Sequence, residues 1–297
     1  MHAMETWIRD NQLNVYQLAI QTDDGISVVY CQPCNACNNI YSVTKVFLNT
    51  AIGMLWDAGR IQLDDRLMPY LQPYLDAPYD PAWDEVTIRH ALSHRMGVDE
   101  GVIDIDRDDI RTYGTEDHLR YILQYPPKFR AGSYRKYTDS AHYLLSLVVE
   151  HLTGAPADDW IRQKLMQPLD FQHTAWTRCP KNHTMGATGA YMRADDMVRL
   201  GWLYVNRGQL DGVPVVSEAW VDAMEQGKFD FYPVKGSSFR CKGGVNGQML
   251  LYSRERRFAA AWTAYEDDRN IRKLTEYVVS RVENGVQMDG GTKKTQG

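Results

Sequence analysis

The 297-residue sequence lacks a long apolar run and an excess of positive charge. Its apolar stretches are shorter than the roughly 18 to 20 residues that span a bilayer. The formal net charge of -5 leaves no basic surface to follow phosphates. We therefore expect no membrane and no nucleic-acid partner. Residues 1–7 lack the basic and apolar parts of a signal peptide, which favours a cytoplasmic location.

Cysteine is scarce and odd in number, with five in the chain. Cys31, Cys34 and Cys37 follow a spacing that resembles part of an iron–sulfur run, but no fourth cysteine follows in sequence. Cys179 or Cys241 could complete such a site in space. We interpret the cluster as reduced thiols and expect neither a metal nor a cofactor.

The chain has strand patterns near both ends and helical patterns between them. Strands are expected at residues 14–21 and 25–31, joined as a hairpin, and at residues 238–241, 248–253 and 258–264. Helical patterns cover residues 5–10, 63–71, 87–94, 115–124, 140–152, 158–166, 194–205, 217–224 and 268–283. A polar tail expected to be disordered follows at residues 288–297.

These patterns predict an α/β fold of the α+β type. The N- and C-terminal strands would form one antiparallel sheet flanked by helices, with a mostly helical second lobe beside it. We assign residues 1–40 and 236–297 to the sheet lobe and residues 41–235 to the helical lobe. They would form one compact unit, with an active site at the interface of the lobes.

A serine and a lysine three residues apart begin the helical pattern of residues 43–56, which stops at Gly59. Ser42, Lys45 and Asn49 share one face of that helix. A serine hydroxyl needs an adjacent base to act as a nucleophile, and a lysine among apolar neighbours can lose its proton near neutral pH. The spacing is short and common, however, and alone it fits an N-cap serine beside a solvated lysine better.

Two further polar clusters lie later in the chain. Tyr137 and Asp139 follow Gly132 and precede an apolar helix, so a phenol could share a proton with a leaving group there. Lys242 stands before Gly243 and Gly244 at an expected strand, where glycines permit close approach of a ligand and the lysine offers a cation. His90 and His94 are spaced i, i+4 but lack the glutamate of a zinc-protease helix, so we interpret them as structural.

Together these motifs resemble the penicillin-recognising serine hydrolases, which include class C β-lactamases, D-alanyl-D-alanine peptidases and family VIII-type esterases. Ser42 and Lys45 match the Ser-x-x-Lys motif. The segment from Tyr137 to Asp139 is similar to the Tyr-x-Asn motif, and the segment that begins at Lys242 is similar to Lys-Thr-Gly. Supporting stretches at residues 87–97, 150–154, 194–201 and 247–248 extend the resemblance over nearly the whole chain.

The resemblance implies roles for these residues. Ser42 would be the nucleophile, Lys45 its general base, and Tyr137 the group that passes the proton to the leaving group. The backbone N–H groups of Ser42 and Val245 would form an oxyanion hole. Lys242 would hold a substrate carboxylate.

Three departures from the family pattern bear on activity. Asp139 replaces the usual asparagine, and a carboxylate near Lys45 would favour the ammonium form. Gly243 removes a hydroxyl from the strand motif, and Ala131 replaces a proline before Gly132.

The sequence therefore predicts a serine hydrolase that forms an acyl-enzyme on a small-molecule ester, amide or lactam. The alternative is a catalytically impaired relative that binds a ligand or partner in the same cleft. A D-alanyl peptidase is the weaker option within the enzyme class, because peptidoglycan lies outside the cytoplasm and the sequence shows no export signal.

Overall fold

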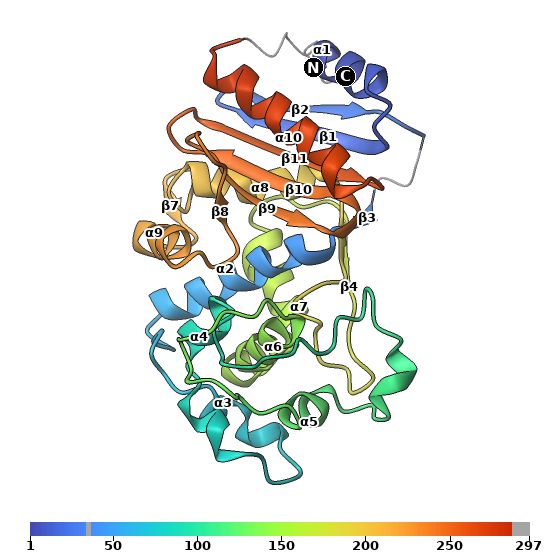
Figure 1. Ribbon diagram of the computed structural model, residues 1–297. Coiled ribbons are helices and arrows are strands. Elements are labelled where there is room, and N and C mark those ends of the chain that lie inside the picture. Colours follow the sequence, from blue (N-terminus) through green and yellow to red (C-terminus); the bar gives the residue numbers. More distant parts are fainter. Residues whose placement is uncertain (34–36, 287–297) are drawn as a thin grey trace.

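The computed structural model describes residues 1–33 and 37–286 (Figure 1). Cys34 and the expected polar tail lie outside these residues. In the part of the chain so described, no helix is both long and apolar enough to cross a membrane.

A six-stranded antiparallel sheet joins the two ends of the chain, which confirms the predicted fold class. The strand order is β2-β1-β11-β10-β9-β8. The strands span Val15–Thr22 (β1), Gly25–Tyr30 (β2), Tyr232–Pro233 (β8), Arg240–Gly244 (β9), Gln248–Ser253 (β10) and Phe258–Ala264 (β11). Within the sheet β1, near the N-terminus, pairs with β11, with Leu18 opposite Trp262 and Ala19 opposite Ala261.

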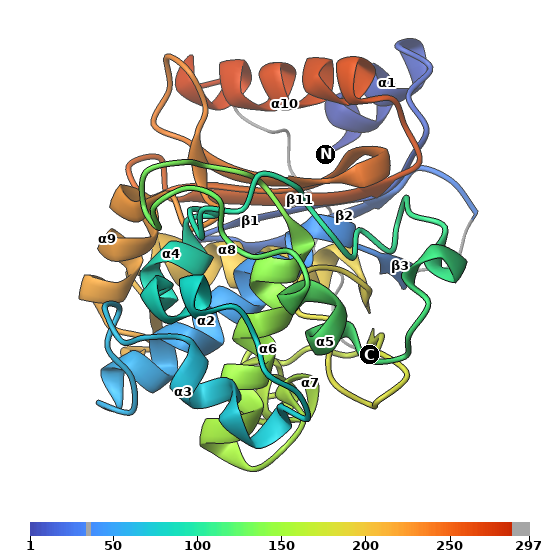
Figure 2. The same ribbon diagram turned by 60° about the horizontal axis from the view of Figure 1, so that its bottom comes forward.

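Helices cover both faces of this sheet, because successive side chains of each strand point to opposite faces. Helices α10 (Asp268–Glu283) and α1 (His2–Asp10) lie on one face, with Trp7 stacked on Tyr277 at 4.2 Å between ring centroids (Figure 2). Helix α8 (Ala194–Val205) packs on the other face. A Cβ atom at Gly201 of α8 would lie 3.0 Å from Leu250, so this glycine permits the close contact.

The remaining α-helices form a cluster around α2 (Thr44–Asp57), which is buried along most of its length. Helix α6 (Asp139–Thr153) packs across it. The others are α3 (Met68–Leu71), α4 (Ile88–Leu92), α5 (His118–Leu123), α7 (Ala157–Ile161) and α9 (Glu218–Gly227). The division into two lobes remains a prediction. Within residues 41–235, α8 packs on the sheet and β8 pairs with β9.

Some predicted elements differ in extent. The helix expected over residues 63–71 is formed only at Met68–Leu71, because Pro69 lacks an N–H donor and fits only the first turn of a helix. The pattern at residues 158–166 divides into α7 and a π-helical turn, Arg162–Met166. Short strands pair in two further sheets that the sequence did not predict: β3 (Asn38–Asn39) with β5 (Ala190–Met192) and β4 (Thr174–Trp176), and β6 (Gln209–Leu210) with β7 (Val213–Pro214).

Candidate active site

Ser42 lies in a 3₁₀ turn, Tyr41–Val43, that leads directly into α2. Tyr41 adopts a left-handed φ of 47°, and its N–H donates to Asn39 Oδ1 at 2.8 Å. This sharp turn brings Ser42 to the wall of a cavity. The Ser42 N–H belongs to the first turn of the helix, where backbone donors have no partner within the helix.

Lys45 lies beneath Ser42 and is completely buried. Its Nζ donates to Ser42 Oγ at 3.0 Å, to Asp139 Oδ1 at 2.7 Å and to the Ala187 carbonyl at 2.9 Å. An ammonium group has three donors, and all three are used here. Burial alone would lower the pKa of Lys45, but the adjacent Asp139 carboxylate outweighs it and raises that pKa above its usual value. The contacts therefore describe a protonated lysine.

Tyr137 connects the serine to a second lysine. Its hydroxyl donates to Ser42 Oγ at 2.9 Å and accepts from Lys242 Nζ at 3.1 Å. The ammonium groups of Lys45 and Lys242 each lie 4.9 Å from the centroid of its ring. Two cations thus flank the phenol.

Lys242 projects from β9 into the interior, where it forms a short ion pair with Asp230. Both side chains are buried. Burial opposes the charged form of each group. The Asp230 carboxylate nevertheless raises the pKa of Lys242 above its usual value, and the Lys242 ammonium lowers the pKa of Asp230 well below its own.

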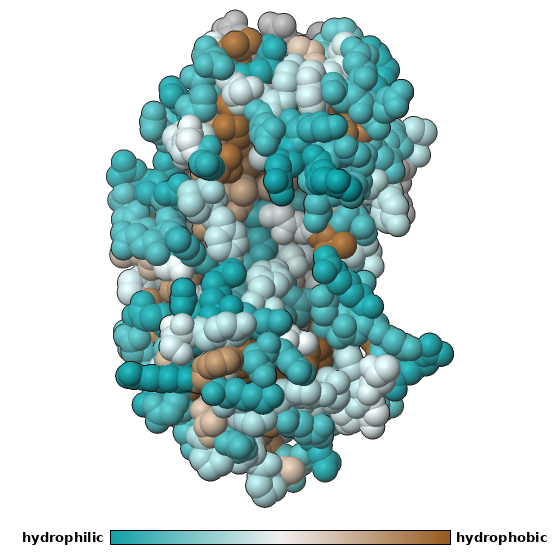
Figure 3. Space-filling model, in the orientation of Figure 1, coloured by the Kyte–Doolittle hydropathy of each residue, from teal (hydrophilic) through white to brown (hydrophobic). Residues whose placement is uncertain are grey.

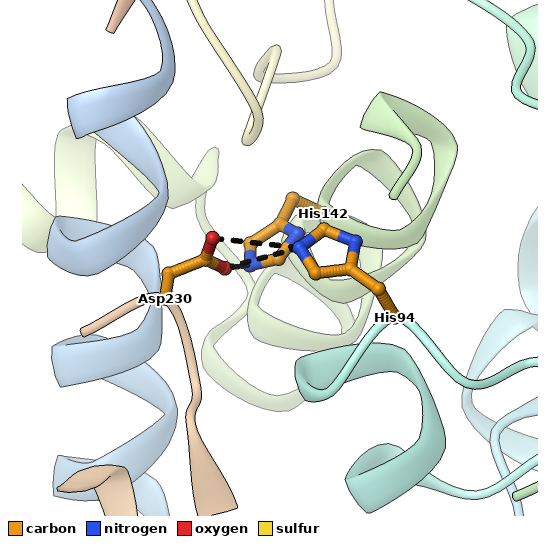
Figure 4. A group of neighbouring side chains, drawn as sticks. All are labelled: His94, His142 and Asp230. Atoms are coloured by element: carbon orange, nitrogen blue, oxygen red, sulfur yellow. Dashed lines mark hydrogen bonds and ion pairs between the residues drawn. The ribbon is translucent and has the colours of Figure 1, made fainter. Parts of the chain in front are cut away.

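Two histidines complete the surroundings of Asp230 (Figure 4). His94 Nε2 lies 3.3 Å and His142 Nε2 lies 3.0 Å from Asp230 Oδ2, and both imidazoles are buried. Burial lowers the pKa of His94, and it lowers the pKa of His142 to about 4 despite the nearby carboxylate. Both histidines are therefore neutral near pH 7. Asn49 Nδ2 lies 3.5 Å from Asp230 Oδ2 and donates to the Phe229 carbonyl at 3.1 Å.

The glycines after Lys242 have different surroundings. A Cβ atom at Gly244 would lie 2.5 Å from the Ile40 carbonyl oxygen, so only glycine lets β9 approach the turn that carries Ser42. A Cβ atom at Gly243 would meet no atom closer than 3.5 Å. Val245 follows directly, and it lines the same cavity as Ser42.

The cavity beside Ser42 has a volume of about 820 Å³. Its lining includes Asp104, Asp106 and Asp139, whose carboxylates lie within 4.8 Å of one another. Burial, reinforced by the nearby Asp139 carboxylate, raises the pKa of both Asp104 and Asp106. The lining also includes the apolar residues Val234, Met249 and Ile271. Figure 3 shows hydrophobic atoms between α10 and β8 on this face of the molecule.

The structure brings together every residue that the sequence singled out for the site. Seven of them line the cavity: Ser42, Tyr137, Asp139, Lys242, Gly243, Gly244 and Val245. Lys45 contacts Ser42 from below. Sequence reasoning missed the contribution of Asp230 and His142, and it assigned His94 only a structural role. His90 has a different role from these groups, because its Nδ1 accepts from the Thr87 N–H and so caps the start of α4.

Comparison with known proteins agrees with this geometry. The beta-lactamase family profile matches residues 35–276. The chain therefore belongs to the beta-lactamase family, as its motifs suggested.

Two curated relatives are a putative D-alanyl-D-alanine carboxypeptidase of Escherichia coli K12 and the N-acetylmuramyl-L-alanine amidase of Bacillus subtilis. The first is 29% identical over 57% of this chain and 42% of its own length. The second is 26% identical over 48% of this chain and 34% of its own length. The chain spans less than half the length of these curated relatives. Their names support a hydrolase at this coarse level.

Among solved structures, a putative 6-aminohexanoate-dimer hydrolase from Bacillus anthracis has a TM-score of 0.78 at 14% identity, over 96% of this chain and 83% of that one. An octameric penicillin-binding protein homologue from Pyrococcus abyssi has a TM-score of 0.73 at 15% identity, over 95% and 77% of the two chains. At this level of identity, both similarities show the fold.

Proposed function

We propose that the protein is a serine hydrolase that forms an acyl-enzyme at Ser42 on a small ester, amide or lactam. One observation carries the proposal: Ser42 Oγ lies within hydrogen-bond distance of both Lys45 Nζ and Tyr137 OH. A nucleophile needs a partner to take its proton and a second partner to protonate the leaving group. Lys45 and Tyr137 would fill these two roles, and the contacts of both with Ser42 support the proposal.

In the first step Ser42 Oγ forms a bond to the acyl carbon while its proton passes to the amine form of Lys45. The N–H groups of Ser42 and Val245 stabilise the negative oxygen of the tetrahedral intermediate. Collapse of the intermediate breaks the bond to the leaving group, which takes a proton from the Tyr137 hydroxyl. Water then attacks the acyl carbon and gives a proton to the Tyr137 phenolate. The bond from the acyl carbon to Ser42 Oγ breaks, Ser42 takes a proton from the Lys45 ammonium, and the acid leaves with all three groups restored.

The Asp139 carboxylate limits the first step near neutral pH. Lys45 can accept a proton only after losing one, and its ion pair with Asp139 raises its pKa. We therefore expect activity to rise with pH.

The test is covalent labelling followed by intact-mass measurement. Wild-type protein incubated with a fluorophosphonate should gain one adduct, and Ser42→Ala should gain none. Ser42→Ala should also lower the hydrolysis of an activated ester by at least about a thousandfold, since the loss of a nucleophile removes the covalent route. Ser133→Ala is the matched control, because Ser133 is exposed and its hydroxyl donates to the Arg130 carbonyl. Wild-type ester hydrolysis by Ser42→Ala would refute the nucleophile assignment.

The Lys45–Asp139 ion pair also favours a second candidate function. If Lys45 keeps its proton throughout, the protein binds a ligand in the cavity without turning it over. A separate incubation with a penicillin tests the lactam class within the enzyme proposal. The absence of an adduct with every acylating reagent, together with saturable binding of an ester analogue, would favour the binding function.

A further inference from the structure

The family resemblance assigns Lys242 to a substrate carboxylate, but its contacts lie elsewhere. Its side chain is only 4% exposed, and its ammonium group contacts the Asp230 carboxylate and the Tyr137 hydroxyl. A cation that is already paired with a buried carboxylate has little charge left to attract an anionic ligand. The Lys242 ammonium group is therefore placed to act on the Tyr137 hydroxyl and not on a substrate carboxylate.

Asp230 is held in place by the groups around it. It lies between α9 and β8, with no exposed surface, and it contacts His94, His142 and Asn49 as well as Lys242. Four polar groups therefore surround the two carboxylate oxygens, and such a carboxylate has little freedom to move.

The cluster could also be considered as a metal site, because His94, His142 and Asp230 place their ligand atoms within 4.8 Å of one another. The hydrogen bonds favour a different arrangement. His94 Nδ1 accepts from the Thr138 N–H at 3.4 Å, which leaves Nε2 to carry the ring proton toward Asp230. The Lys242 ammonium then supplies the positive charge that a metal would bring.

We propose that Asp230 is a positioning residue that neutralises Lys242 and holds it on the Tyr137 hydroxyl, so that the site takes acyl substrates without a carboxylate at this position. The part of the inference that concerns substrates rests on the proposed function. The preference for uncharged over anionic ligands does not depend on turnover. Lys242 then supports the phenol that serves Ser42, and a neutral group of the substrate faces β9.

Charges on the cavity wall near Ser42 also disfavour an anionic ligand. Asp104 and Asp106 lie on that wall, and negative charge on them opposes the entry of an anion, whereas the charge of Asp139 is taken up by Lys45. Cations also line the cavity, at Arg107, Lys235 and Arg272. The experiment must therefore distinguish the effect of Lys242 on anion binding from the effects of these three cations.

A binding experiment with Ser42→Ala tests the preference without turnover. Benzoate and benzamide have the same shape and differ in charge, so their dissociation constants, measured by calorimetry, report the selection for a carboxylate. We expect the two constants to agree within about threefold, because a neutralised lysine adds no more than a weak exposed ion pair would. Adding Asp230→Asn removes the partner of Lys242 while keeping its shape, and benzoate should gain about tenfold over benzamide.

A tenfold or greater preference of Ser42→Ala for benzoate would overturn the substrate class. If Lys242→Met then removes that preference, the neutralisation by Asp230 is wrong as well. The Ser42→Ala protein decides the first point alone, even if Asp230→Asn fails to fold. A folded Asp230→Asn variant with an unchanged benzoate-to-benzamide ratio would overturn the role of Asp230.

Kinetics provide a second readout in the active enzyme. For 4-nitrophenyl acetate and mono-4-nitrophenyl glutarate, Asp230→Asn should shift the kcat/KM ratio about tenfold toward the glutarate, mainly through KM. A merely structural role would lower both values alike and leave the ratio unchanged. If the wild type takes no fluorophosphonate adduct, the proposed function fails, while the binding experiment still decides the preference.

Discussion

Replacing Asp139 by asparagine should lower the pH at which esterase activity rises. The Asp139 carboxylate lies 2.7 Å from Lys45 Nζ, and both side chains are buried. Removing the carboxylate leaves burial as the main influence on Lys45, and burial lowers its pKa. The amine form, which can accept the Ser42 proton, then becomes more populated near neutral pH.

The size of the effect follows from the hydrogen bond that is exchanged. A hydrogen bond to a charged group contributes about 1.5–3 kcal/mol, and a neutral one about 0.5–1.5 kcal/mol. Asparagine keeps an oxygen that can accept from Lys45, so the net loss is about 1–1.5 kcal/mol. That difference changes the ammonium-to-amine ratio by about tenfold. We expect activity near pH 7 to rise by a similar factor.

The same substitution should destabilise the fold only moderately. Removing one partner of a buried ion pair costs about 3–5 kcal/mol when the other charge remains. Lys45 can release its proton instead, and it keeps Ser42 and Ala187 as acceptors, so we expect about 1–2 kcal/mol. Because the pair raises the pKa of Lys45, the stability that this shift contributes is fully present below the unfolded lysine pKa as long as the carboxylate partner carries its charge. The contribution disappears only as the pH rises through the folded value.

The assay is the pH profile of kcat/KM for an activated ester, with a urea titration for stability. Asp104→Asn is the matched control, since it removes a carboxylate from the same cavity at a residue that forms an ion pair with Arg107, at 4.0 Å. The control should leave the midpoint of the profile nearly unchanged. An unmoved profile in a folded Asp139→Asn protein, or a loss of its activity, would refute the account of Lys45 as the base.

Two other predictions concern neighbouring features. Gly244→Ala should displace β9 from the Ser42 turn, which should lower esterase activity by about tenfold or more and stability by about 1–3 kcal/mol. Gly243→Ala has room for its methyl group and should change neither quantity. Equal effects of the two substitutions in urea titrations and ester assays would contradict this prediction. Chelation should alter neither activity nor melting temperature, because we interpret Cys31, Cys34 and Cys37 as thiols. Stoichiometric zinc or iron whose removal lowers the melting temperature would overturn that interpretation.

Elements with strong local signals could be predicted from the sequence. Helix α8 and strands β10 and β11 have the predicted bounds, because their apolar periodicity and flanking turns are contained within each segment. The two-residue strands were missed since such strands carry no alternation of their own. Their pairing depends on distant segments, as Asn38 shows by lying opposite Met192.

The site divides in the same way. Ser42 and Lys45 lie on one turn of helix, so their contact follows from spacing alone. Tyr137 and Lys242 could be placed beside them only through the family resemblance. Asp230 carried no signal, because it is a single aspartate in a connection after α9, and its partners His94 and Lys242 are brought to it by tertiary packing.

The pairing of β1 with β11 has a consequence for folding. Asn14, next to β1, donates to the carbonyl of Tyr265, which lies 251 residues further along the chain. During synthesis the β1 edge of the β1–β2 hairpin therefore stays unpaired until β11 has emerged. Strand β1 has the sequence VYQLAIQT, which carries no charge to discourage pairing with another chain. Slow folding and aggregation of incomplete chains are the expected consequences of a sheet closed by its most distant strands.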